Sequence, residues 1–400
     1  MLPRVKINFS NGALGTVAPS ADCVAGLIVT AAAVSDTFVL GNGYIIHQMS
    51  DLATLGLNST NNAFAYKHIK EFYDAAGDGA ELWLMGVADS VKPSDAVDKE
   101  NAYAKKLILL ANGRIRFIAV AHKPAAAYEA DIEDGLDSDV LVAAQKAQQL
   151  AEWATDSRFA PLFVLLAARG YAKENITELA DLTTFNYNRV GVVLGDTVKE
   201  SEGAAVALVA GQIAACPVHR HIGRVRDGAL PVMSLFIDDD DPSVANVETV
   251  NDKGYITFRT FTGKSGYFIA DDNLATATSD DYRSIARRRT IDKAYRIAYN
   301  TMLEFVNDEV PVTDDGYVSP AYAKGVESEV IASIANEMTA AGELGTDPSD
   351  TSDKGCKCYV NPKQNILATS KLNMVIQVKP YGYAKYIDIE LGFITTNTEE

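Results

Sequence analysis

The sequence predicts an α/β fold: a mainly parallel sheet with flanking helices, followed by a smaller C-terminal α+β domain, with extended terminal β-strand arms. Three observations predict it. Apolar strands alternate with helices from residue 23 to residue 237, the pattern changes after residue 238, and solitary alternating strands lie near both termini. We expect a strand arm at 1–20, an α/β domain at 21–240, a C-terminal domain at 241–380 and a second strand arm at 381–400.

The N-terminal arm is predicted from residues 4–9, RVKINF, in which Val5, Ile7 and Phe9 fall on one face of a strand. An Asn-Gly turn and a Gly/Ala/Pro stretch follow, so this strand has no neighbour in sequence with which to pair. Such a strand has free edges, and we expect it to pair with another copy of the chain.

The α/β domain is predicted from continuous apolar runs separated by amphipathic segments. Continuous runs are typical of parallel strands whose two faces are both covered by helices. We expect helices around residues 63–76, 102–110, 141–153 and 204–215. The expected strands are VAGLIVT (24–30), ELWLMGV (81–87), RIRFIAVA (114–121), APLFVLLA (160–167), RVGVVLG (189–195) and VMSLFI (232–237).

The C-terminal domain begins after the polar run FIDDDDPSV with two antiparallel strands, GYITFRTF (254–261) and SGYFIAD (265–271). A long helix follows, with its start predicted at the oxygen-rich residues 278–281 and its apolar stripe running from Ile291 to Phe305. A second helix is expected at 320–341, with Val326, Val330, Ile334 and Met338 on one apolar stripe and Gly342 ending it. Two paired strands are expected at 372–380 and 383–393. The last provides the candidates for strand pairing between subunits: Tyr386, Ile387, Ile389, Leu391 and Phe393.

Composition limits the classes of partner. The chain has 53 acidic against 36 basic residues and a formal net charge of −17, which argues against nucleic acid or an anionic membrane surface. No apolar run approaches the roughly 20 residues of a membrane span, so we expect no membrane insertion. The N-terminus lacks the apolar core of a signal peptide, and four irregularly spaced cysteines fit reduced thiols, so we expect folding in a cytoplasm.

Possible catalytic or metal sites are weak in this sequence. Cys216, His219 and His221 have a spacing that could serve a metal, but no fourth ligand lies nearby in sequence. Gly263-Lys264-Ser265 resembles the end of a phosphate-binding loop without its first glycine, and Cys356-x-Cys358 is an equally weak metal signal. The run Asp238–Asp241 fits a solvated turn, and it also leaves open an alternative, an α/β metal-dependent hydrolase. We predict no catalytic residue, metal or cofactor.

Basic residues are concentrated on the long helix of an otherwise acidic chain. Arg283, Arg287 and Arg288 fit a solvated helix face with local pairs such as Arg288 with Asp292. They also fit an electrostatic contact with an acidic partner surface. Both interpretations are open at this point.

Three C-terminal runs resemble contractile tail sheath proteins, of the group found in phages and phage-like injection systems of Bacteroidetes and related bacteria. The runs are GYFIADD (266–272), SDDYRSIARRRTIDKAYRIAY (279–299) and residues 361–393, NPKQNILATSKLNMVIQVKPYGYAKYIDIELGF. VAGLIVTAAAVSDTFVLGN (24–42) resembles the opening strand and loop of the wider family. The chain departs from the family in lacking a large inserted outer domain, so we expect a compact subunit.

The resemblance implies a structural protein that is not an enzyme. Sheath subunits form helical or stacked-ring homopolymers around an inner tail tube, and their terminal arms complete the sheets of neighbours. Baseplate and tail terminator proteins would be further partners, and assembly would take place in a bacterial cytoplasm. An extended, high-energy lattice would contract to drive the tube through a cell envelope. Residues 241–380 would form the C-terminal sheath domain, and Arg283, Arg287 and Arg288 are candidates for contact with the tube.

Overall fold

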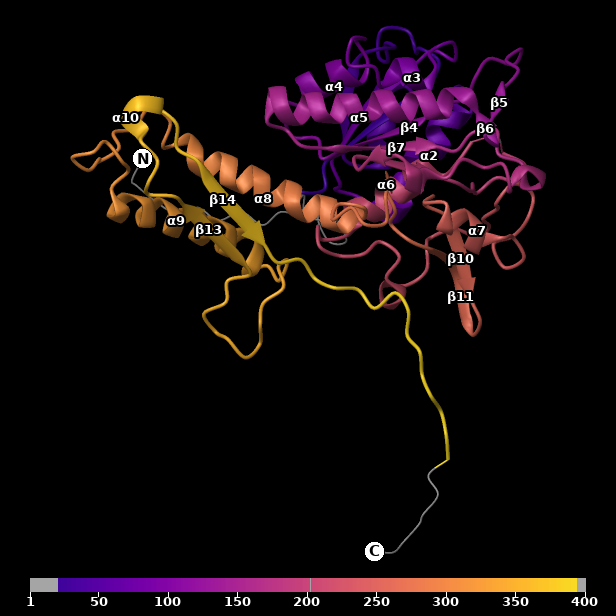
Figure 1. Cartoon of the computed structure of the whole chain (residues 1–400). Helices are drawn as coiled ribbons and strands as arrows, with labels where there is room; N and C mark the ends of the chain where they lie inside the picture. The colour runs from indigo at the N-terminus through magenta and orange to yellow at the C-terminus, as the bar shows by residue number, and fades with distance from the viewer. Residues whose placement is uncertain (1–20, 202, 394–400) are drawn as a thin grey trace, which may run out of the picture.

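The computed structural model describes residues 21–201 and 203–393. Figure 1 shows a larger α/β body and a smaller lobe, with helix α8 running from the body into that lobe. The predicted N-terminal arm, with Val5, Ile7 and Phe9, lies outside the described residues. The body and the lobe therefore share one long helix as their connection.

Within the described residues, six strands form the main sheet in the order β2-β3-β1-β4-β7-β9. All neighbouring pairs are parallel except β2 with β3, which is antiparallel. The short edge strand β2 is not among the strands predicted from the sequence. The strands are β1 (Ala25–Thr30), β2 (Gly43–Ile46), β3 (Leu82–Val87), β4 (Phe117–Ala121), β7 (Phe163–Ala167) and β9 (Val190–Val193).

Helices cover both faces of this sheet, with α3, α4 and α5 on one side and α2 and α6 on the other (Figure 1). In β1, Leu27 and Val29 enter the core under α2 and α6, while Ile28 enters the core under α4 and α5. This two-sided burial is why the strands are continuous apolar runs. The helices of the body are α1 (Leu52–Leu55), α2 (Ala63–Ala76), α3 (Pro93–Ala96), α4 (Ala104–Leu110), α5 (Ser138–Arg158), α6 (Val206–Ala215) and α7 (Val247–Asp252).

Helices α2 and α6 approach each other at Gly211. A Cβ atom built there would lie 2.4 Å from the carbonyl oxygen of Phe72 and 2.9 Å from the Cβ of Ala75. Since real Cβ atoms cannot come this close to backbone atoms, only glycine allows the two helices to pack at this separation.

Residues beyond the predicted boundary at 240 still belong to the cores of the body. Phe258, Ile269 and Ile285 pack in the core under α2 and α6, and Tyr255 and Ala275 pack in the opposite core. The expected antiparallel pair is confirmed as β10 (Phe258–Phe261) with β11 (Lys264–Ile269). Short pairs complete the body: β5 (Ile132–Glu133) with β6 (Leu136–Asp137), and β8 (Asn186–Tyr187) with β12 (Ala275–Thr276).

The smaller lobe packs the second half of α8 (Ile285–Leu303) against α9 (Pro320–Ile334) and a hairpin of β13 (Cys356–Val360) with β14 (Met374–Val378). The predicted stripe of α9 is confirmed, because Val326, Val330, Ile334 and Met338 are all buried. Gly342 has the predicted left-handed conformation, with φ of 70°. A π-helical turn (Ala335–Thr339) extends α9, and α10 (Ile366–Thr369) lies in the β13–β14 connection.

Three predicted elements are wrong. VMSLFI is not a strand of the main sheet, because only isolated bridges at Phe236 and Ile237 form there. β14 pairs with β13, so the expected hairpin between 372–380 and 383–393 does not form within the chain. Helix α8 begins later than predicted: Ser284 caps it by accepting from the Arg287 N–H, and the carboxylate of the buried Asp272 accepts from the Ala286 N–H.

Candidate functional site

The C-terminal segment after β14 is the most exposed apolar part of the described chain. Figure 1 shows it leaving the contact between the lobes and running away from both. It makes no strand ladder within the described residues. The five predicted pairing residues are therefore left to solvent, with exposed fractions of 86% for Tyr386, 73% for Ile387, 79% for Ile389, 96% for Leu391 and 100% for Phe393.

The first residues of this segment are anchored on the body before the exposed part begins. The hydroxyl of Tyr383 donates to the carbonyl of His219, and its ring packs edge-on against His221 with centroids 5.6 Å apart. The ammonium of Lys385 lies 2.6 and 2.7 Å from the two carboxylate oxygens of Asp271. Burial raises the pKa of Tyr383 to about 12, so its hydroxyl keeps its proton and remains a donor. This anchor fixes where the exposed segment leaves the body.

His221 lies between two carboxylates beneath this anchor. Its Nε2 lies 2.9 Å from Asp271 and 3.1 Å from Asp272. Burial disfavours the imidazolium, but the charges and hydrogen bonds of Asp272 and Asp271 outweigh it and raise the pKa of His221 to about 9. Two positive groups, His221 and Lys385, thus balance two carboxylates.

Cys216, His219 and His221, whose spacing was a weak metal signal, do not form a common ligand cluster among the described residues. Cys216 is buried, the ring of His219 packs on Tyr381, and only His221 joins acidic residues. His221, Asp271 and Asp272 offer ligand atoms within 4.8 Å of one another, but Lys385 already contacts Asp271. The signal that sequence reasoning missed is the acidic pair directly after β11, which has a lysine partner more than a hundred residues later.

Helix α8 does not present its arginines as a solvated face. Arg288 is only 7% exposed, donates to Asp292 at 2.7 Å and stacks over the ring of Tyr282. Burial lowers the pKa of its guanidinium despite the neighbouring Asp292. The pair of Arg288 with Asp292 is confirmed, but the solvated face is wrong. Arg283 and Arg287 remain partly exposed, so they alone remain candidates for contact with a partner.

A network of charged residues holds the first half of α8 in the body. Asp292 also accepts from Arg189, which precedes β9, at 3.1 and 3.3 Å. Asp22, which precedes β1, contacts Lys293 at 2.6 Å and Arg296 at 2.7 Å. Lys293 also reaches Glu343 of the smaller lobe at 2.7 Å. The basic residues of α8 therefore connect the sheet, the helix and the smaller lobe.

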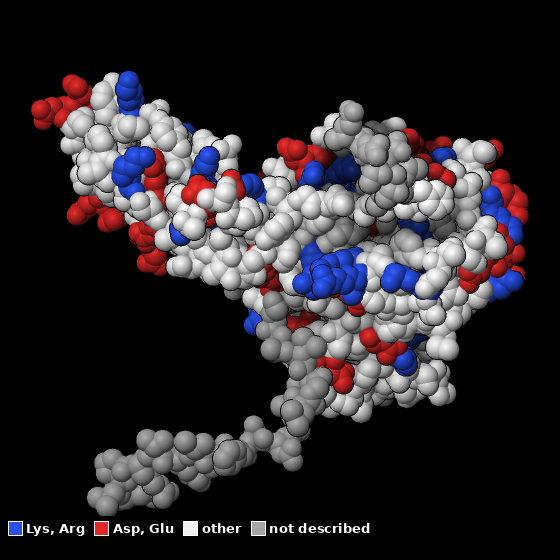
Figure 2. All heavy atoms as spheres, turned by 90° about the horizontal axis from the view of Figure 1, so that it is seen from below, with Lys and Arg blue, Asp and Glu red and all other residues white. Residues whose placement is uncertain are grey.

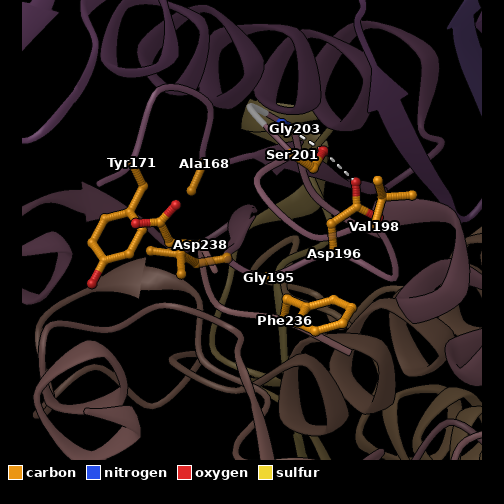
Figure 3. Close-up of a pocket in the computed structure, with 10 residues that line it drawn as sticks. Ala168, Tyr171, Gly195, Asp196, Val198, Ser201, Gly203, Phe236 and Asp238 are labelled. Carbon is orange, nitrogen blue, oxygen red and sulfur yellow. Dashed lines mark hydrogen bonds between the residues drawn. The ribbon is translucent and has the colours of Figure 1, made fainter. Parts of the chain in front are cut away.

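A small pocket lies at the carboxyl ends of β7 and β9, where open α/β sheets commonly bind ligands. Figure 3 shows Tyr171 and Asp238 on one side of it and Asp196, Val198 and Ser201 on the other. Ser201 donates to Asp196 at 2.6 Å and accepts from the Gly203 N–H. Within the described residues no imidazole contacts Ser201, so this serine lacks the base of a nucleophilic site.

The carboxylates of Asp238–Asp241, which would form the metal site of the alternative hydrolase, contact donors of the protein instead. Asp238 accepts from the backbone N–H of Lys173, whose ammonium contacts Asp239 at 2.5 Å and Asp240 at 3.2 Å. Asp241 caps a turn at Ser243 and accepts from the hydroxyl of Tyr267 at 2.6 Å. The four carboxylates act as local acceptors, and they do not converge on a common point.

The remaining sequence candidates for metal or phosphate binding are ordinary parts of strands and turns. Cys356 and Cys358 lie on the inward face of β13, where burial raises the pKa of each thiol. Gly263 lies in the turn between β10 and β11, and Lys264 and Ser265 begin β11. Figure 2 shows acidic and basic side chains interspersed on one face, with a basic group near the centre of the body. None of the described helices is both long and apolar enough to span a membrane.

Two family models match the chain. The model described as DUF2586, N-terminal domain, matches residues 2–273, and the model described as DUF2586, C-terminal domain, matches residues 281–398. The first match ends at residue 273 and the second begins at residue 281, shortly before α8 begins at Ile285. No curated protein sequence matches the chain significantly.

The fold is similar to that of sheath proteins of contractile injection systems. A chain in the cryo-EM structure of the anti-feeding prophage baseplate has a TM-score of 0.64 at 16% identity, with 99% of this chain and 99% of that chain covered. The helical sheath of that particle in its contracted state gives 0.62 at 16% identity, covering 98% and 99%. The contracted sheath complex of an extracellular contractile injection system, PVC, gives 0.59 at 14% identity, covering 98% and 97%. The expected mixed α/β sheath fold is therefore confirmed.

Proposed function

The chain belongs to the DUF2586 family, and we propose that it is the structural subunit of a contractile tail sheath. In this proposal the subunit polymerises around an inner tube and contracts to drive the tube through a cell envelope. Similarity to sheath chains over the full length of both proteins supports it. The observation that carries it is the exposed part of the C-terminal segment, residues 386–393, whose apolar side chains are left to solvent in the described chain.

This segment has the pattern of a strand that pairs outside its own subunit. In an extended chain Ile387, Ile389, Leu391 and Phe393 share one face, because successive side chains point to opposite sides. Asp388 and Glu390 fall on the other face. Alternation of this kind suits a strand added to a sheet edge, with one face buried and one in solvent. We infer that the segment completes a sheet of a neighbouring subunit.

The test changes one face of the segment at a time. Replacing Ile387, Ile389 and Leu391 with serine removes the apolar face, and the matched control, Asp388→Asn with Glu390→Gln, changes the opposite face. Because these side chains are solvent-exposed, neither variant is expected to change the melting temperature of the monomer. We expect the serine variant to remain monomeric in negative-stain electron microscopy while the control forms long hollow cylinders. Cylinders from both variants would refute the proposal.

The N-terminal strand at Val5, Ile7 and Phe9 is proposed as the second arm. Removing residues 1–12 should leave a folded protein that does not polymerise, because each subunit would lack one of its two pairing strands. Circular dichroism checks the fold and electron microscopy checks assembly. Cylinders of normal appearance after the deletion would contradict this role.

Contact with the inner tube is proposed for Arg283, just before α8, and Arg287, in its first turn, because both are partly exposed while Arg288 is buried. Arg283→Glu with Arg287→Glu should abolish co-assembly with the tube protein without unfolding the subunit. Lys264→Glu is the control, since Lys264 is an exposed basic residue at the β10–β11 turn. Unchanged sedimentation of the double variant with tubes would exclude this surface.

Contraction in this proposal needs no enzymatic step. The arms keep their strand hydrogen bonds while the bodies rotate and repack, and better lateral contacts in the contracted lattice supply the energy. Partners at the two ends would be baseplate and tail terminator proteins, with assembly in the bacterial cytoplasm.

A further inference from the structure

A second, polar cavity lies where the first half of α8 meets the amino-terminal ends of the central strands. Asp22 precedes β1, Arg116 precedes β4 and Phe163 begins β7. Helix α8 contributes Arg289, Asp292 and Arg296, which share a face at spacings of three and four residues. Val218 closes the lining. The cavity holds about one particle of the size of a water molecule.

Two guanidinium groups at this cavity make no hydrogen bond or ion pair with a carboxylate among the described residues. Arg289 donates to the carbonyls of Cys216 at 2.9 Å and Pro217 at 3.4 Å, and its Nε, which is buried, has no acceptor in the described chain. Arg116 donates to the carbonyls of Ala21 at 2.7 Å and Gly113 at 2.6 Å. Carbonyl oxygens satisfy donors but do not neutralise charge, and an uncompensated buried cation is costly.

The two acids that line the cavity are committed to other cations. Asp292 accepts from Arg189 and Arg288, and the two oxygens of Asp22 contact Arg296 and Lys293. The network around the cavity thus contains more basic than acidic side chains. The N-terminal residues 1–21 contain no Asp or Glu that could restore the balance. Burial and the nearby Arg296 lower the pKa of Arg116 to about 10, although the carboxylates of Asp22 and Asp292 oppose this shift.

We propose that this cavity is a binding site for a small monatomic anion, a halide such as chloride, held by Arg289 and Arg116. A halide accepts N–H donors from any direction and carries the missing negative charge, whereas phosphate or sulfate exceeds the space for one water-sized particle. The bound ion joins Arg289 of α8 to Arg116, which precedes β4, so it stabilises the attachment of the helix to the sheet.

The experiment compares the full-length protein in sodium chloride, sodium bromide and sodium gluconate at equal ionic strength. Ligand binding to the folded state raises stability with ligand concentration, so the melting temperature should rise saturably with either halide, by on the order of 2 °C, relative to gluconate. Arg289→Gln should remove this difference. Arg283→Gln, just before α8 and outside the cavity lining, should retain it. Coinciding curves in the three salts, or a halide effect that persists in Arg289→Gln, would overturn the proposal.

A second measurement uses the wild-type chain and does not depend on how the variants fold. Chloride that exchanges with a protein site broadens the ³⁵Cl resonance of the bulk ion. We expect an excess linewidth that added bromide reverses. A linewidth equal to that of buffer would show that the cavity holds water, and the halide site would be rejected.

Discussion

Asp292→Asn tests whether buried ion pairs hold α8 in the body. The Asp292 carboxylate accepts from Arg288 at 2.7 Å and from two nitrogens of Arg189 at 3.1 and 3.3 Å, and it is nearly inaccessible to solvent. Asparagine keeps the shape but removes the charge, which leaves two buried guanidinium groups without a counter-charge. Removing one partner of a buried pair costs about 3–5 kcal/mol, so we expect a loss of about 4 kcal/mol in the free energy of unfolding.

Urea unfolding followed by circular dichroism measures this loss. The control is Asp74→Asn, whose carboxylate pairs with Lys70 on the surface of α2, with side chains 37% and 55% exposed. An exposed pair of this kind contributes at most about 1 kcal/mol. Hydrogen exchange should show the additional opening of Asp292→Asn in the first half of α8. If both variants lose the same small amount, below about 1 kcal/mol, the argument from burial is refuted.

Three further predictions follow from single contacts. His221→Gln should remove a pH dependence: because the folded pKa of about 9 exceeds the unfolded value, wild-type stability from His221 is complete below about pH 6.5 and is lost as pH rises through 9. Parallel urea midpoints of both proteins over this range would contradict it. Lys385→Ala should speed chymotrypsin cleavage near Tyr383, because it removes the contact with Asp271 that anchors the segment. Lys379→Ala, which loses only an exposed contact with Asp353, should leave the cleavage rate unchanged. Equal cleavage rates in the two variants would exclude the anchor. Gly211→Ala should destabilise by about 1–3 kcal/mol through the clash with Phe72, whereas Gly325→Ala, in open space on α9, should stabilise by about 0.5–1 kcal/mol. Equal unfolding free energies for the two alanine variants would disprove the close packing.

Local periodicity predicted those elements that are stabilised mainly by burial of their own side chains. The apolar runs of the parallel strands and the stripe from Val326 to Met338 could be identified because sheet and helix bury residues at fixed spacings. VMSLFI failed this test, since Leu235 and Ile237 pack in the body cores from a segment that forms only isolated bridges, while Met233 is 98% exposed. Local sequence pattern also could not show which strand pairs with which: β14 pairs with β13 and not with residues 383–393.

By itself the sequence determined the α/β class, most strands and helices, and a family resemblance that the fold confirms. Only the tertiary structure determined which charged residues are buried and which partners they contact. Charged residues on a helix look the same in sequence whether they face water or an opposite charge. Here distant residues supply the partners: Asp22 contacts Lys293 and Arg296, Glu343 contacts Lys293, and Arg189 pairs with Asp292. The anchor of Lys385 on Asp271 and the cavity beside Arg289 arise in the same way. The strength of electrostatic contacts depends on separation and burial in space, and spacing along the chain encodes neither.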